Sequence, residues 1–167
     1  MAATYEPIAT VTTSNSQAEV EFTSISGSFT DLILIANAQS NKSGSSIDGL
    51  RLQVNQDTAT NYSESVLYGD GSTAASYRGS NASYINVGVM SQTSATYQPI
   101  TIAHFQNYSN TTTNKTILSR SSAAPEATYA TVALWRSTSA ITSFKLYLAG
   151  QTFKNGSTFT LYGIKAA

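Results

Sequence analysis

The chain has few side chains that could carry out acid–base or nucleophilic chemistry. His104 is its single histidine, cysteine is absent, and only 11% of the residues are charged. A Ser-His-Asp site would need a carboxylate behind His104 and a poised serine in front of it. The residues two and four positions earlier are Ile102 and Ile100, and no Gly-x-Ser-x-Gly turn occurs to expose a nucleophilic serine. We therefore expect His104 to be a satisfied core or interface residue.

The acidic residues are spread along the chain. A glycosidase needs two carboxyl groups about 5–10 Å apart in a cleft. Glu19 and Glu21 could be neighbours at about 7 Å on one strand face, but they alternate with apolar residues and so mark the face in contact with water. Asp70 could give one oxygen to calcium, yet no second acid follows it at ligand spacing. We expect no enzymatic activity, no catalytic residue, no metal and no cofactor.

Charge and hydropathy exclude other classes of partner. Nine basic and nine acidic residues leave a formal net charge of +0, whereas a nucleic-acid-binding protein carries a basic stripe. The longest apolar run, residues 32–36, is far shorter than the roughly 20 residues that span a bilayer. The first residues show no basic and apolar signal regions. We expect a product of the cytoplasm with neither a nucleic-acid nor a membrane partner.

The secondary structure that would hold the side chains of any functional site is predicted to consist of β-strands. Alternation of polar and apolar residues recurs throughout, and helical spacing is nearly absent. Asp31 to Gln39 is apolar on both faces in its first half, which predicts a central strand covered on both sides. Asn155-Gly156, between two alternating segments, is the strongest hairpin signal.

The expected architecture is one all-β domain over residues 1–167, an antiparallel β-sandwich of nine to eleven strands. The length favours a jelly-roll-like arrangement over the immunoglobulin-like fold of about 100 residues. The positions that we expect in the core are Leu32, Leu34, Leu52, Val54, Val87, Ile102, Val132, Leu134, Phe144, Leu146, Phe159 and Leu161.

Two polar stretches are too long to be simple turns, and long loops are often functional. They run from Asn37 to Asp48 and from Gly69 to Asn81. The second combines Asp70, Tyr77 and Arg78, and tyrosine and arginine are common interface hot spots. We expect these three residues to form the main specific contact of the domain, with the first stretch as the next candidate.

A set of short, turn-rich segments carries a family resemblance. In their order along the chain they resemble a group of small virion proteins from tailed bacteriophages, and the likeness covers nearly the whole chain. The resemblance implies a particle component without a catalytic signature: a head decoration (cement) protein, a head fibre or a tail-associated protein. The segments are Thr4–Ala9, Phe29–Leu32, Leu50–Asn55, Tyr68–Gly71, Arg78–Asn81, Asn107–Thr112, Lys115–Thr116, Ser119–Ser121, Trp135–Thr138 and Thr160–Ile164.

Two hypotheses follow from the resemblance. The chain has no heptads, collagen triplets or other repeats that would build a fibre shaft. This favours a cement protein of the virion that forms a homotrimer and binds the phage major capsid protein or another virion protein. The alternative is a tail- or head-fibre-associated module that binds a receptor or a host surface glycan through loop tyrosines.

Overall fold

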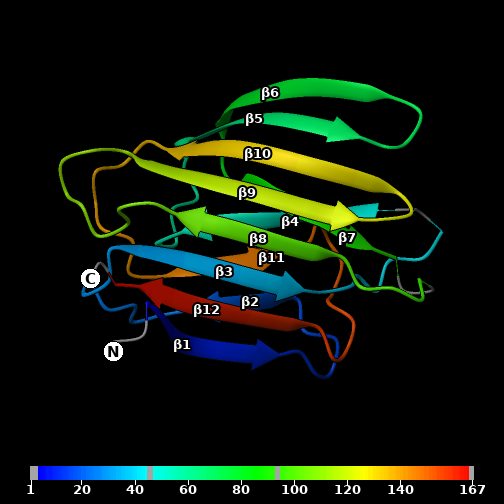
Figure 1. Ribbon diagram of the computed structural model, residues 1–167, viewed down its shortest axis with the longest axis horizontal. Helices are drawn as coiled ribbons and strands as arrows, with labels where there is room; N and C mark the ends of the chain where they lie inside the picture. Colours follow the sequence, from blue (N-terminus) through cyan, green and yellow to red (C-terminus); the bar gives the residue numbers. More distant parts are fainter. Residues whose placement is uncertain (1–3, 45–46, 93–94, 166–167) are drawn as a thin grey trace.

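The computed structural model describes residues 4–44, 47–92 and 95–165, and it shows two packed layers of strands (Figure 1). One sheet has eight strands in the order β1-β12-β3-β8-β9-β10-β5-β6, and the other has four in the order β2-β11-β4-β7. The described residues contain no helix, so the all-β sandwich is confirmed, with twelve strands. The strands are β1 (Tyr5–Thr12), β2 (Glu19–Phe22), β3 (Asp31–Asn37), β4 (Ile47–Val54), β5 (Tyr62–Gly69), β6 (Ala74–Ala82), β7 (Ile85–Ser91), β8 (Ile100–Phe105), β9 (Lys115–Ala123), β10 (Ala127–Trp135), β11 (Phe144–Tyr147) and β12 (Thr158–Ile164).

The strand pairs are nested along the chain. β1 pairs with β12, β2 with β11, β3 with β8 and β4 with β7, all antiparallel. This is the pairing of a jelly roll, in which one long antiparallel ribbon is folded across two sheets. The remaining strands form two hairpins, β5–β6 and β9–β10, which extend the large sheet beyond β8. The large sheet therefore overhangs the small one, and β5 and β6 lie at the far end of the overhang in Figure 1.

The core between the sheets is one continuous apolar cluster. Phe144 of β11 lies at its centre, with its ring centroid 4.9 Å from that of Phe105 and 5.2 Å from that of Phe22. Such contacts between aromatic rings add to the stabilisation that burial alone provides. The sandwich is thus held together mainly by rings and aliphatic side chains from both layers.

Nine of the twelve expected core positions are buried, and three were wrong. Val132 is 52% exposed, and Ile102 and Leu134 are half-buried on the outer face of the large sheet. Smaller or polar neighbours on the same strands take the inward positions. The expectation that β3 is covered on both sides was also wrong. Its outer residues, Ile33 and Ile35, have no second layer of strands over them.

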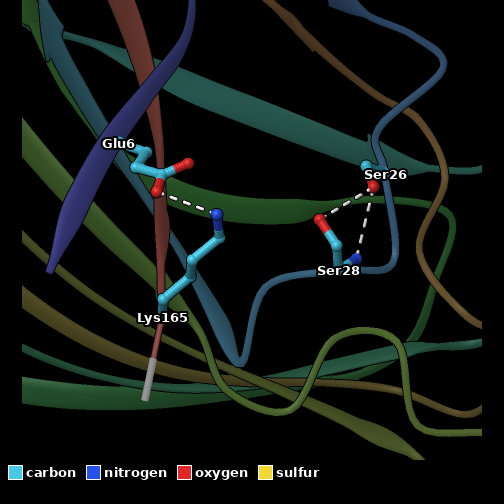
Figure 2. A network of polar contacts seen from close by, with 4 residues as sticks. All are labelled: Glu6, Ser26, Ser28 and Lys165. Atoms are coloured by element: carbon cyan, nitrogen blue, oxygen red, sulfur yellow. Dashed lines mark hydrogen bonds and ion pairs between the residues drawn. The ribbon is translucent and has the colours of Figure 1, made fainter. Parts of the chain in front are cut away.

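The first and last strands, β1 and β12, pair at one edge of the large sheet. Lys165 Nζ lies 2.8 Å from Glu6 Oε1 beside this pairing, and Figure 2 shows the two side chains pointing toward each other. The same view shows Ser26 Oγ, which donates to Ser28 Oγ at 3.0 Å and accepts the N–H of Ser28 at 3.3 Å. An exposed ion pair contributes about 0–1 kcal/mol, so backbone pairing is the main contribution at this edge.

β7 approaches the large sheet much more closely than the usual spacing of about 10 Å between packed sheets. Ser121 Oγ of β9 accepts the N–H of Val89 at 3.0 Å and lies 2.8 Å from Thr101 Oγ1 of β8. A Cβ at position 88 would lie 2.8 Å from Ser121 Oγ and still closer to Thr101 Oγ1. Glycine at position 88 is therefore what allows the two sheets to meet here.

We predict that Gly88→Ala destabilises the fold by about 1–3 kcal/mol, the usual cost of overpacking a closely packed site. Gly27→Ala is the matched control, since a Cβ there would make an ordinary 3.6 Å contact with Ser109, and it should change stability by less than about 0.5 kcal/mol. Urea unfolding of both variants and the parent measures the difference. Equal midpoints for the two variants would contradict the close approach at Gly88.

Candidate binding surfaces

The segment from Gly69 to Asn81 consists of a short turn and strand β6, the second half of a hairpin with β5, so the expected loop was wrong. β5 ends at Gly69 and β6 begins at Ala74. Asp70 Oδ1 accepts the N–H of Thr73 at 2.6 Å and that of Ser72 at 3.0 Å, and so closes the short turn. These backbone hydrogen bonds hold the pKa of Asp70 below its ordinary value. Asp70 thus has a local structural role that needs no ligand.

Tyr77 and Arg78 lie on opposite faces of β6. Tyr77 is opposite Val66 of β5, whose side chain is buried, and Arg78 is opposite the exposed Ser65. Side chains alternate along a strand, so Tyr77 faces the side of the small sheet and Arg78 faces outward. The structure therefore does not bring Asp70, Tyr77 and Arg78 together into one site.

The other expected loop, from Asn37 to Asp48, connects β3 to β4, and its residues 45–46 lie outside the described residues. Gln39 and Ser40 form isolated bridges to Ser91 and Phe153. Ser40 Oγ donates to Asp48 Oδ2 at 3.1 Å. The first half of this connection is thus joined to the sandwich by hydrogen bonds.

The outer face of the large sheet carries a row of side chains that crosses five strands. Tyr162, Ile33, His104, Leu118 and Val132 are direct neighbours in the register, each opposite the next. Leu118 is 37% exposed and Val132 is 52% exposed. The row is apolar except for His104 and the tyrosine hydroxyl.

A second row runs beside it on the same face. Ile35 is opposite Ile102, which is opposite Arg120, and Ala130 is opposite both Arg120 and Leu67. Leu67, on β5, is 65% exposed, the most exposed large apolar side chain among the described residues. The outer apolar face, as we call this surface, consists of Ile33, Ile35, Leu67, Ile102, Leu118, Ala130, Val132 and Leu134.

His104 lies within this face and has a partner that the sequence did not reveal. Its Nε2 is 3.2 Å from Asp31 Oδ2, and Asp31 Oδ1 accepts the N–H of Asn107 at 2.7 Å. About a third of the His104 side chain is exposed, so His104 is not a core residue, and the other expectation, a role in an interface, stays a prediction. Among the described residues no hydroxyl group is hydrogen-bonded to its ring, and the arrangement is a His–Asp pair without a nucleophile.

A cleft lies on the opposite side of the large sheet, beneath the overhang. A cavity of about 180 Å³ separates the β7 edge of the small sheet from β6 and β10. Aromatic rings form part of its wall on the large sheet, and an amide and small residues lie across from them. We call it the tyrosine cleft; its lining residues are Ile47, Gly49, Tyr77, Asn86, Gly88, Val89, Tyr129 and Thr131.

Tyr68 packs against both tyrosine rings that line the cleft. Tyr68 stacks on Tyr129 with the ring centroids 5.3 Å apart and the planes 14° apart. It also contacts Tyr77, at 6.5 Å between centroids. The three rings hold one another in fixed positions, which lowers the entropy cost of using them to bind a ligand.

Glu64 of β5 is buried behind the lining of the cleft, where it is hydrogen-bonded to Asn86. It is 7% exposed, its Oε2 accepts the N–H of Asn86 at 2.7 Å, and its Oε1 accepts the Asn86 side-chain N–H at 2.8 Å. These bonds connect the overhang to β7 and fix the direction of the Asn86 amide. Burial, with a further contribution from the Glu64 carboxylate, raises the pKa of Tyr77 to about 12. Sequence analysis did not single out Glu64 or Asn86, since nothing in their local pattern shows that they meet.

The acids considered for hydrolysis are exposed. Glu19 and Glu21 lie on the outer side of β2, and Glu19 Oε2 is 3.2 Å from Lys145 Nζ. Within the part of the chain that the structure describes, no group of three or more His, Cys, Asp or Glu could hold a metal ion. No described segment forms a helix that could cross a membrane.

Comparisons of the chain with protein-family models, with curated protein sequences and with solved structures find no match.

We predict that Tyr77 titrates near pH 12 and that Glu64→Gln lowers its pKa, which should stay above the ordinary value because burial remains. NMR of ¹³Cζ-labelled tyrosine measures this. Tyr62 is the internal control, since burial raises its pKa to about 12 without a contribution from Glu64. Unfolded tyrosines lose their protons first between pH 10 and 12, so the contribution of both groups to stability should be lost as the pH rises through that range. An unchanged Tyr77 pKa in Glu64→Gln would contradict the geometry.

Proposed function

We propose that the protein is a non-enzymatic structural component of a bacteriophage virion, a capsid decoration (cement) protein that docks on the outside of the head. The observation that carries the proposal is the outer apolar face, where Leu118 and Val132 are adjacent and exposed on an uncovered sheet. Single exposed aliphatic residues are ordinary, whereas a contiguous apolar patch marks an interaction surface. The resemblance of the turn-rich segments to small virion proteins supports a capsid protein as the occupant.

The dimensions of the large sheet suit a stable protein interface. The outer side of the whole sheet has eight strands about 4.8 Å apart with six residues at about 3.3 Å each, which makes roughly 34 by 20 Å, or about 700 Å². The outer apolar face occupies five of these strands. A standard interface buries about 800 Å² on each partner. The large sheet alone therefore offers nearly the area that specific docking requires.

The chemistry of the face also suits permanent attachment. On this side of the sheet the Asp31 carboxylate is already paired with His104. Two exposed arginines lie among or beside the apolar residues, Arg120 between Ile102 and Ala130 and Arg78 opposite Ser65. Binding to the assembled shell would stabilise the shell by mass action, because the free energy of association favours only the bound state. The His–Asp pair without a nucleophile supports a role other than catalysis.

The resemblance, together with the jelly-roll-like fold, supports a homotrimer as the docking unit. The chain has no cysteine, so the contacts between subunits would be apolar and backbone contacts. We predict that the trimer persists in about 1 M salt, where the Debye length is about 3 Å, and in chelator. Analytical ultracentrifugation measures this, and dissociation under either condition would contradict apolar assembly.

We predict that Leu118→Lys and Val132→Lys each weaken binding to purified heads at least tenfold, about 1.4 kcal/mol, because each would bury an unpaired charge in the interface. Thr111→Lys, in an exposed turn, adds the same charge elsewhere and is the control. Co-sedimentation with heads stripped of the protein measures the affinity, and circular dichroism checks the fold. Parent-like binding by both lysine variants would show that docking uses another surface, and failure of the parent itself to bind heads would refute decoration.

A further inference from the structure

The tyrosine cleft opens on the side of the large sheet opposite to the outer apolar face, so it stays open when that face is covered. We propose that the tyrosine cleft binds one ring of a neutral saccharide. This inference goes beyond docking and does not depend on it, because the two surfaces share strands but not side chains.

The size and shape of the cleft suit a single sugar ring. Its volume of about 180 Å³ is below the ~300–1,000 Å³ of pockets for drug-sized ligands. Tyr77 and Tyr129 both line it, and Tyr77 is 42% exposed. Tyrosine rings present an apolar face and a polar hydroxyl, which match the C–H face and the hydroxyl groups of a pyranose.

The polar groups of the cleft suit a ligand that is rich in hydroxyls. Thr131 lines the cavity with a hydroxyl that can donate and accept, and Asn86 lines it with an amide whose direction Glu64 fixes. A site built to hydrogen-bond hydroxyl groups discriminates strongly against ligands that lack them. These groups therefore favour a saccharide over an apolar ring of similar size.

The charge of the site favours a neutral ligand. An anion would lie close to the Glu64 carboxylate, and the two neighbouring arginines are directed elsewhere. Arg78 is on the other face of β6, and Arg51, opposite Asn86, lies over the ring of Tyr84 at 4.1 Å from its centroid. A quaternary ammonium group could contact the tyrosine rings, but it offers no hydroxyl groups to the Asn86 side-chain oxygen or to the Thr131 hydroxyl. Both Glu64 oxygens already accept hydrogen bonds from Asn86, which reduces the pull of that carboxylate on a cation.

Gly49, across the cleft from the rings, keeps room for the Asn86 amide. A Cβ at position 49 would lie 3.2 Å from Asn86 Oδ1, so the amide would have to shift by a few tenths of an ångström while Glu64 holds its N–H. A variant with alanine at this position therefore tests the polar wall independently of the tyrosines.

The test is an NMR titration of the ¹⁵N-labelled full chain with the methyl glycosides of glucose, galactose, mannose and N-acetylglucosamine, and with choline chloride as a probe without a sugar ring. We expect at least one glycoside to shift the amide signals of Gly49, Asn86 and Thr131 saturably. Tyr77→Ala should weaken that binding at least tenfold, and Tyr77→Phe, which keeps the ring, should bind within about threefold of the parent. Tyr5→Ala, which removes an exposed tyrosine on β1, is the matched control and should bind like the parent.

Tyr77 is half-exposed on an edge strand, so Tyr77→Ala is expected to fold, and thermal unfolding checks this. Gly49→Ala provides a second measurement and should also weaken binding at least fivefold. The inference is overturned if no glycoside shifts these amides, if choline alone does so, or if both Tyr77→Ala and Gly49→Ala bind like the parent. Val132→Lys should leave glycoside binding unchanged, and Tyr77→Ala should leave head docking unchanged, so each proposal can fail without the other.

Discussion

The contact of Gly88 with the hydroxyl groups of Thr101 and Ser121 determines where the small sheet ends beneath the large one. An edge strand usually leaves a row of backbone groups exposed, but here Ser121 accepts the N–H of Val89 and joins the edge of β7 to the large sheet. Beyond β7 no further strand of the small sheet follows among the described residues, so the tips of β10 and β5 and the edge strand β6 extend past the second layer. Their inner side can therefore become a cleft, and the position of that cleft follows from a missing side chain at Gly88.

The β5–β6 hairpin, which extends beyond the small sheet, is attached to the core by hydrogen bonds between polar groups as well as by packing. The buried Tyr62 hydroxyl, at the start of β5, donates to the carbonyl of Asp57 at 2.8 Å and accepts the N–H of Val54 at 3.1 Å. Trp135 Nε1, at the end of β10, donates to Asp57 Oδ2 at 2.7 Å. A buried polar group is costly unless it is hydrogen-bonded. The hydrogen bonds of Tyr62 and Trp135 with Asp57 therefore fix the start of the hairpin against the core. The tip of the hairpin extends past the small sheet.

Alternation of residue types was enough to predict the all-β fold and most of the core, because the period of two is a local property. It did not predict which face of β10 is buried, since Val132 and Leu134 look like core residues while Ala133, which is small, takes the inward place beside Trp135. β6 was mistaken for a loop because an edge strand has no continuous buried face to show. The His104–Asp31 and Glu64–Asn86 pairs join separate strands, and only the strand order brings them together.

β10 shows how one strand can serve two surfaces. Its odd-numbered residues Tyr129 and Thr131 line the tyrosine cleft, while Ala130 and Val132 between them belong to the outer apolar face. Because successive side chains point to opposite faces, a single substitution changes one surface and leaves the other in place. A one-residue shift in the pairing of β10 would exchange both surfaces at once. The register with β9 and β5 is regular along β10, and it is this register that keeps the two surfaces separate.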